Sequence, residues 1–132
     1  MRRIFVDTSA WYALVDVRDP DHEAATDFMH GNSAPLVTSN FVLDETLTLL
    51  KSKLGAQTAI EFGMKVRNST FCTLHRIDPK LEKAAWEVFC RYTDKEWSFT
   101  DCTSYMVMKR LKLNEAFALD AHFAQMGFRI WP

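Results

Sequence analysis

Short apolar segments separated by helical segments constrain the fold of this 132-residue chain more than any other feature of its sequence. The apolar segments lie at residues 3–6, 35–38, 71–77, 116–119 and 128–131. Strands that are joined through helices usually pair in parallel, and a parallel sheet needs cover on both faces. We therefore expect an α/β fold with a central parallel β-sheet flanked by α-helices on both faces.

Capping residues mark where the helices should begin. A side-chain oxygen just before a helix can accept a hydrogen bond from its free N–H groups, and proline is favoured at the first helical position. The longest helix is expected at residues 41–54, and Gly55 ends it. The expected helices begin after Thr8 or Ser9, Asp19, Ser39 or Asn40, Asp78, and Thr100.

Composition places the chain among soluble globular proteins and predicts one domain over residues 1–132. It is 48% hydrophobic and 25% charged, which excludes a disordered chain. The formal net charge of -1 argues against a pure nucleic-acid-binding module, because such modules usually carry a basic excess. No apolar stretch is long enough for a membrane span or a signal peptide. Three widely spaced cysteines suit free thiols in a reducing compartment, so we expect a cytoplasmic protein.

Three aspartates stand where a parallel sheet binds ligands. Asp7 follows the first expected strand, and Asp120 follows the strand at residues 116–119. Ligands bind beyond the carboxyl ends of such strands. Asp101 starts a helix, where backbone N–H groups favour an ionised carboxylate. Taken singly, an aspartate in such a position is more often an ordinary helix cap than a ligand.

A fourth acid, Glu45, is expected to point inward from the helix at residues 41–54. Its helical neighbours are apolar, namely Phe41, Val42 and Leu49. The adjacent Asp44 has polar neighbours instead, namely Asn40, Thr48 and Lys51. A buried carboxylate needs a cation or strong donors beside it, so Glu45 should have either an ion-pair partner or a metal.

Together, Asp7, Glu45, Asp101 and Asp120 predict a metal site. If four acids share one crevice without a cation, their repulsion would protonate some of them or destabilise the fold. Oxygen ligands select Mg²⁺ or Mn²⁺, and no histidine–cysteine cluster competes for zinc. Such ions at a crevice suit the hydrolysis of a phosphodiester bond.

The chain also resembles PIN-domain proteins, especially the VapC-type toxins. Four blocks carry the resemblance in order, and they are IFVDTSAWYALVDVRDPDHEAA, TSNFVLDETLTLL, WSFTDCTSYMVMK and FALDAHFAQMGF. The resemblance implies a single PIN-like domain and an Mg²⁺- or Mn²⁺-dependent endoribonuclease that acts on RNA. It also implies that Asp7, Glu45, Asp101 and Asp120 bind the metal and generate the attacking hydroxide.

Further expectations follow from the same resemblance. Thr8 and Ser9 resemble residues that hold a phosphate or a metal-bound water, although both suit a helix cap equally well. Some members carry an acid where this chain has His122, which predicts an indirect role for His122 beside the metal ligands. VapC-type toxins commonly form homodimers and are inhibited by a small antitoxin protein, so both partners are implied here.

Aromatic residues and rival functions complete the predictions. Trp97 lies in a polar loop before Asp101, where it could contact RNA, whereas Trp86 and Trp131 suit core packing. A phosphatase with an aspartate nucleophile would need a second aspartate two residues on, but Ser9 stands there. A non-catalytic PIN-fold interaction module and a housekeeping RNA-processing nuclease remain as alternatives.

Overall fold

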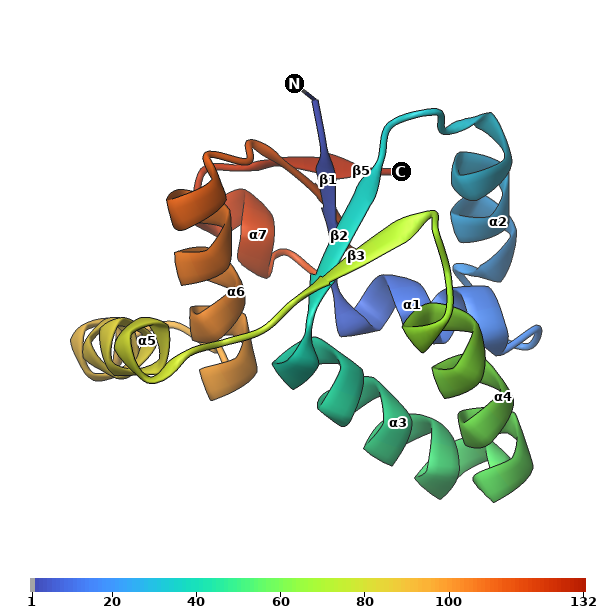
Figure 1. Cartoon of the computed structure of the whole chain (residues 1–132). Coiled ribbons are helices and arrows are strands. Elements are labelled where there is room, and N and C mark those ends of the chain that lie inside the picture. Colours follow the sequence, from blue (N-terminus) through green and yellow to red (C-terminus); the bar gives the residue numbers. More distant parts are fainter. Residues whose placement is uncertain (1) are drawn as a thin grey trace.

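A computed structural model describes residues 2–132 and contains one five-stranded sheet (Figure 1). The strand order is β3-β2-β1-β4-β5, and every neighbouring pair is parallel. The strands are β1 (Ile4–Val6), β2 (Leu36–Ser39), β3 (Cys72–His75), β4 (Glu115–Phe117) and β5 (Arg129–Trp131). The parallel sheet predicted from the sequence is therefore confirmed.

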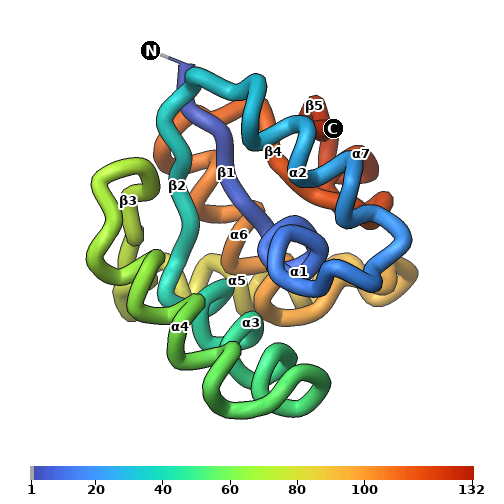
Figure 2. The backbone as a smooth tube through the Cα atoms, turned by 90° about the vertical axis from the view of Figure 1, so that its right-hand side faces the viewer, coloured from blue at the N-terminus to red at the C-terminus, as the bar shows by residue number. Residues whose placement is uncertain are grey.

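Helices cover both faces of this sheet, as predicted. Helices α1 and α2 lie on one side of the strands, and α6 and α7 lie on the other (Figures 1 and 2). Helices α3 and α4 extend below the end of β2, and α5 packs against α6. Their bounds are α1 (Thr8–Val15), α2 (His22–Gly31), α3 (Asn40–Leu54), α4 (Ala56–Arg67), α5 (Pro79–Arg91), α6 (Phe99–Leu111) and α7 (His122–Gln125).

The core is built on β1, whose three residues are all buried. Phe5 of β1 contacts Phe123 of α7, with ring centroids 6.3 Å apart, and Phe28 of α2 contacts Phe117 of β4 at 4.6 Å. These two contacts lie on opposite faces of the sheet, so both helical layers are anchored to the central strands. The apolar burial holds the carboxyl ends of β1 and β4 in fixed positions.

Several helix starts differ from the predictions by a few residues. Asp7, not Thr8 or Ser9, caps α1, and Ser98, not Thr100, caps α6. Helix α2 begins after Asp21, because residues 19–21 form a turn before it. Strand β4 ends at Phe117, so two residues separate it from Asp120. Helix α3 does begin after Ser39 and end at Gly55, whose φ of 96° suits glycine.

A second hydrophobic cluster lies between α5 and α6, around Ala85, Val88, Trp97 and Cys102. The prediction that Trp86 packs in the core is wrong, because its side chain is 56% exposed on the outer face of α5. Within residues 2–132, no helix has the length and apolar character that crossing a bilayer would require.

Candidate active site

The candidate site lies at the carboxyl end of β1, between the elements that follow β1, β2 and β4. Asp7 is the residue after β1, and it is also the N-cap of α1. Asp101 sits in the first turn of α6, and Asp120 lies in the turn before α7. The fold therefore brings Asp7 close to two aspartates that lie more than 90 positions further along the sequence.

Asp7 is almost completely buried, with 2% of its surface exposed. Its Oδ2 accepts hydrogen bonds from the backbone N–H of Ser9 at 3.3 Å and from the Ser9 hydroxyl at 2.8 Å. The same hydroxyl oxygen accepts a hydrogen bond from the N–H of Leu119 at 2.9 Å, which ties the segment before Asp120 to α1. The other carboxylate oxygen, Oδ1, is buried and has no hydrogen-bond partner within residues 2–132.

Asp101 is held by two donors on one oxygen. In a capping box, the side chain of Ser98 accepts from the N–H of Asp101, while Asp101 Oδ2 accepts from the N–H of Ser98 at 3.0 Å. The Nδ1 atom of His122 lies 2.8 Å from the same Oδ2. No hydrogen bond from residues 2–132 reaches Oδ1 of Asp101.

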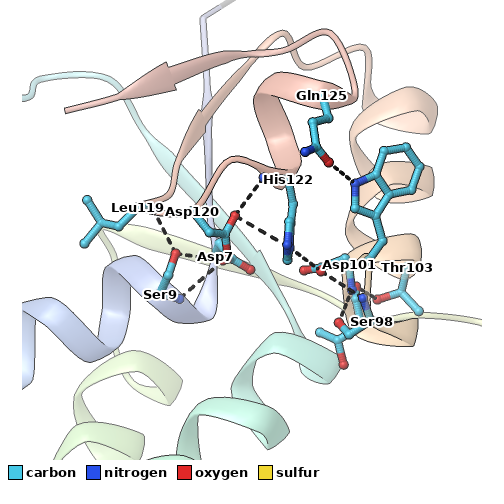
Figure 3. A network of polar contacts seen from close by, with 11 residues as sticks. Asp7, Ser9, Ser98, Asp101, Thr103, Leu119, Asp120, His122 and Gln125 are labelled. Carbon is cyan, nitrogen blue, oxygen red and sulfur yellow. Dashed lines mark hydrogen bonds and ion pairs between the residues drawn. The ribbon is translucent and has the colours of Figure 1, made fainter. Parts of the chain in front are cut away.

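Asp120 is tied to the same histidine. The backbone N–H of His122 donates to Asp120 Oδ1 at 3.1 Å, and Nδ1 of its imidazole lies 3.7 Å from that oxygen. Figure 3 shows the imidazole between the carboxylates of Asp101 and Asp120, with Asp7 close by. His122 therefore links α6 to the turn that carries Asp120.

The three aspartates share one pattern of contacts. Each has one oxygen that protein donors hold and a second oxygen that receives no hydrogen bond from residues 2–132. Buried polar atoms in folded proteins nearly always have a partner, and an unsatisfied one destabilises the fold. Of the three open oxygens, Oδ1 of Asp7 is the one that is fully buried, and it is therefore unusual enough to indicate a ligand.

Electrostatics at the site are unfavourable for the ionised acids. Burial, together with the charges of Asp101 and Asp120, raises the pKa of Asp7 to about 7. Burial also raises the pKa of Asp101, while the Ser98 N–H and His122 act in the opposite direction. Among residues 2–132, no lysine or arginine forms an ion pair with these acids. The site thus lacks the positive charge that would stabilise it.

Glu45 lies on α3 with its side chain half-buried, whereas the neighbouring Asp44 is exposed. This contrast is the one predicted from the helical pattern. Leu49, one turn beyond Glu45, lines a pocket of about 240 Å³ together with Ser9 and Asp120. No hydrogen bond or ion pair in the described part of the chain involves Glu45, so the contacts join only the three aspartates.

The remaining predicted residues divide between the site and the core. Ser9 contacts Asp7 directly, and Thr8 is buried with a hydroxyl that has no partner among residues 2–132. Trp97 does not reach the site surface, because its side chain is only 7% exposed and its Nε1 donates to Gln125 at 2.9 Å. Its ring packs against Tyr92 and Tyr105, which leaves no face open for a base.

Ser98 is the site residue that our sequence analysis missed. The pattern Ser98-x-x-Asp101 is a capping-box signature, and it could have been recognised from the sequence. We placed the cap at Thr100 because it directly precedes Asp101. The correct position matters chemically, because the box holds one oxygen of Asp101 and leaves the other available.

The donor set fits a small, hard divalent cation. Carboxylate oxygens suit Mg²⁺ and Mn²⁺, and the buried Oδ1 of Asp7 is an acceptor without a donor. Within residues 2–132, however, no three acidic, histidine or cysteine side chains already stand in a ligating arrangement. Bringing the open oxygens onto one ion therefore requires side-chain rotation, which surface-facing Asp120 can make more easily than buried Asp7.

Comparisons with known proteins find relatives along almost the whole chain. The 23S rRNA-specific endonuclease VapC20 of Mycobacterium tuberculosis is 38% identical over 125 residues, which cover 95% of each chain. A VapC ribonuclease of Archaeoglobus fulgidus is 32% identical and covers 90% of this chain and 78% of its own. The crystal structure of VapC20, described as a sarcin–ricin loop cleaving toxin, superposes with a TM-score of 0.92 at 36% identity over 98% of this chain and 99% of that one.

Two more distant structures share the fold alone. They are FitAcB of Neisseria gonorrhoeae, at 12% identity, and DNA-bound VapBC of Salmonella typhimurium, at 13% identity. Both superpose with a TM-score of 0.69. Coverage of this chain is 98% in both cases. The family model for the PIN domain matches residues 4–129, almost the whole length of the chain. With its parallel sheet and its aspartates at the carboxyl end of β1, the chain belongs to the PIN-domain family.

Proposed function

We propose that this protein is an Mg²⁺- or Mn²⁺-dependent endoribonuclease and the toxin of a toxin–antitoxin pair. The observation that carries the proposal is the open oxygen on each of Asp7, Asp101 and Asp120, in a site without lysine or arginine partners among residues 2–132. Relatives named as ribonucleases over most of this chain support an enzyme rather than a non-catalytic interaction module.

The roles of the residues follow from their contacts. Asp7 is fixed by Ser9 and offers its buried Oδ1, while Asp101 is fixed by its capping box and offers its own Oδ1. Asp120 is more exposed and can adapt its position, and Glu45 completes the set from α3. A bound divalent ion would supply an acidified water and neutralise charge on the phosphate. Buried Asp7 and Asp101 give the rigid half of the site, and Asp120 and Glu45 the adjustable half.

The substrate we propose is the sarcin–ricin loop of 23S ribosomal RNA. The support is the VapC20 relative, whose name and structure describe that target and whose sequence matches over 95% of this chain. Its backbone also superposes closely, with a TM-score of 0.92. Loops in RNA expose bases and backbone to a protein crevice in a way that a continuous duplex does not.

The test is cleavage of purified ribosomes in the presence of Mn²⁺, with primer extension across the sarcin–ricin loop. Wild-type protein should produce one new terminus in that loop, and Asp7→Asn should lower the rate by about 10³-fold. Glu45→Gln and Asp44→Asn form a matched pair on α3, and only Glu45→Gln should lose activity. Equal cleavage by wild type and Asp7→Asn would reveal a contaminant and refute this site.

A small antitoxin is the protein partner we propose, and the groove between α3 and α4 is the surface we assign to it. The groove measures about 410 Å³ and is lined by apolar side chains, including Ile60 and Met64, which are 54% and 59% exposed. Lys51 and Arg67 also line it, so an apolar segment with acidic flanks would fit. Met64→Glu should lower the affinity of the chain for an antitoxin that copurifies with it, as measured by calorimetry. Unchanged affinity would exclude the groove.

A homodimer is the assembly we propose, through an aromatic patch of Trp86, Phe89, Phe99 and Phe41. Trp86 and Phe89 are exposed on α5, and their rings lie within 6.4 Å of the Phe99 ring, which in turn lies 6.1 Å from that of Phe41. Apolar patches of this kind mark interfaces. Light scattering should give twice the chain mass for wild type and the monomer mass for Trp86→Lys. A monomeric wild type would refute the assembly.

We also propose that residues 1–132 act as one domain and work in the cytoplasm, where ribosomes are found. The family model spans residues 4–129, and one sheet connects all five strands.

A growth assay separates a toxin from a housekeeping nuclease. Induction of the wild-type chain alone should stop growth, and induction of Asp7→Asn should not. Normal growth with active enzyme would favour the housekeeping role.

A further inference from the structure

His122 occupies a position between two of the candidate metal ligands. Its imidazole Nδ1 lies 2.8 Å from Asp101 Oδ2, and its backbone N–H lies 3.1 Å from Asp120 Oδ1. One residue thus contacts both acids, one through its side chain and one through its main chain. The side-chain contact spans 21 positions in the sequence and connects α7 to α6.

The contact with Asp101 controls which of its oxygens is available. Asp101 Oδ2 already accepts from the Ser98 N–H at 3.0 Å, and the imidazole adds a second donor at the same oxygen. Two donors from different directions fix the plane of the carboxylate. They also leave Oδ1 as the oxygen that can bind an ion.

We propose that His122 is a positioning residue, which orients Asp101 and the turn carrying Asp120 for the divalent ion without binding that ion itself. The proposal rests on the metal-dependent function proposed above. Histidine Nδ1 must carry a hydrogen to donate to Asp101, and that hydrogen leaves no lone pair on Nδ1 for a metal. The other ring nitrogen, Nε2, keeps its lone pair, but the atom that faces the carboxylates of Asp101 and Asp120 is Nδ1. A carboxylate at this position could not donate this hydrogen bond, and without a shared cation it would repel Asp101.

The local sequence explains why this histidine reaches Asp101. His122 is the first residue of α7, and the backbone of this short helix packs next to β5. Phe123, the next residue, is fully buried against Phe5 of β1. Burial of Phe123 fixes the rotation of α7, and His122 is consequently directed toward α6 (Figure 3).

The experiment measures Mn²⁺ affinity by titration calorimetry on the whole chain, with three substitutions at one position. His122→Ala removes the donor and should weaken Mn²⁺ binding by about 10- to 100-fold. His122→Asn places an amide N–H near the original Nδ1 and should restore most of the affinity. His122→Gln extends its amide beyond that point and should not restore it. His30→Ala, on the exposed end of α2, is the matched control and should bind Mn²⁺ like wild type.

Thermal midpoints without metal separate positioning from a general loss of structure. If His122→Ala unfolds, the Mn²⁺ affinities of His122→Asn and His122→Gln still test the proposal, because both variants keep an amide at this position. Wild-type affinity in His122→Ala, or equal affinities in Asn and Gln, would overturn the proposal. So would a directly coordinated nitrogen in the electron spin echo spectrum of bound Mn²⁺. Absence of Mn²⁺ binding to wild type would instead refute the proposed metal-dependent function itself.

Discussion

Acids at the two ends of the parallel sheet have opposite surroundings. At the carboxyl end, Asp7 is buried near Asp101 and Asp120, and its pKa is raised to about 7. At the amino end, Glu115 begins β4 and its pKa is lowered, first by hydrogen bonds from Arg2 and then by one from Trp131. Asp7 directly follows β1 and Glu115 begins β4, two neighbouring strands of one sheet, so the difference lies in the side chains around them.

The amino end is satisfied by protein groups alone. Arg2 donates to both oxygens of Glu115 at 2.9–3.2 Å, and Trp131 donates to Oε1 at 2.9 Å. Arg129 stacks over the Trp131 ring at 4.2 Å from its centroid. Every charge in this cluster has an opposite charge or a π-face beside it, which is the arrangement expected of a structural ion pair.

The carboxyl end keeps its acids without such partners, and this difference supports the proposal that it is the functional end. A chain selected only for stability would place an arginine beside Asp7, as it does beside Glu115. An arginine there would fill the oxygens that a cation needs. In the proposed metal-dependent function, the site gives up stability for metal binding, and the predictions below measure that loss of stability.

The largest expected effect is on the pH dependence of metal-free stability. Because Asp7 has an ordinary pKa of 3.8 when unfolded and about 7 when folded, the folded chain holds its proton more tightly. The stability that this proton provides is complete below about pH 4 and is lost as pH rises to about 7. Asp7→Asn, which is neutral throughout, should gain up to about 4 kcal/mol over wild type at pH 8.

Urea unfolding at pH 4 and pH 8, with a chelator present to remove metal, measures this effect. The quantity to compare is the free energy of unfolding of Asp7→Asn minus that of wild type. The difference is needed because other acids, such as Asp78, have lowered pKa values and act in the opposite direction. Asp44→Asn, at an exposed site on α3, is the control and should follow wild type at both pH values. A variant Asp7→Asn that is less stable than wild type at pH 8 would contradict the unfavourable burial of this charge.

Binding of a divalent metal ion should restore the stability that the chain loses by burying acids at the carboxyl end of the sheet. Mg²⁺ or Mn²⁺ that binds only the folded chain stabilises it by about 2.7 kcal/mol at a concentration one hundred times its Kd. For a chain of this size, the thermal midpoint should rise by about 10 °C. The rise should disappear in Asp101→Asn and persist in Glu115→Gln. Differential scanning fluorimetry provides the measurement, and a full rise in Asp101→Asn would remove Asp101 from the ligands.

Much of the fold was accessible from the sequence because local signals and burial agreed. Helix α3 was predicted within one residue, since Ser39 and Gly55 provide a clear cap and stop. The error at Trp86 has a different origin. A tryptophan on a helix suggests burial, but α5 packs on α6 through Leu81, Ala85 and Val88, and Trp86 lies on the other side of the helix. Which side packs depends on a distant segment, which the local pattern does not reveal.

The candidate site was only partly accessible for the same reason. The convergence of Asp7, Asp101 and Asp120 follows from a parallel sheet, whose strand ends share one edge. The sequence could not show which oxygen of each acid is held, because that depends on donors such as Ser98 and His122. It also could not show that Trp97 is buried, since the polar loop around it is exposed while its ring enters the cluster between α5 and α6.

The smallest expected effect belongs to Glu115→Gln, which sharpens the contrast from the amino end. Glutamine keeps an acceptor for Arg2 and Trp131 but removes the charge, and an ion pair this exposed to solvent contributes little to stability. The lowered pKa of Glu115 means that its contribution is present at neutral pH and is lost as pH falls through the folded pKa, so the variant and wild type should converge in acid. Urea unfolding at pH 7 and pH 3 checks this convergence, while ribosome cleavage by the variant should match wild type. If Glu115→Gln lost cleavage, as Asp7→Asn is expected to, a charge at the amino end would control chemistry at the carboxyl end. The two ends of the sheet could then not be separated into a structural half and a functional half.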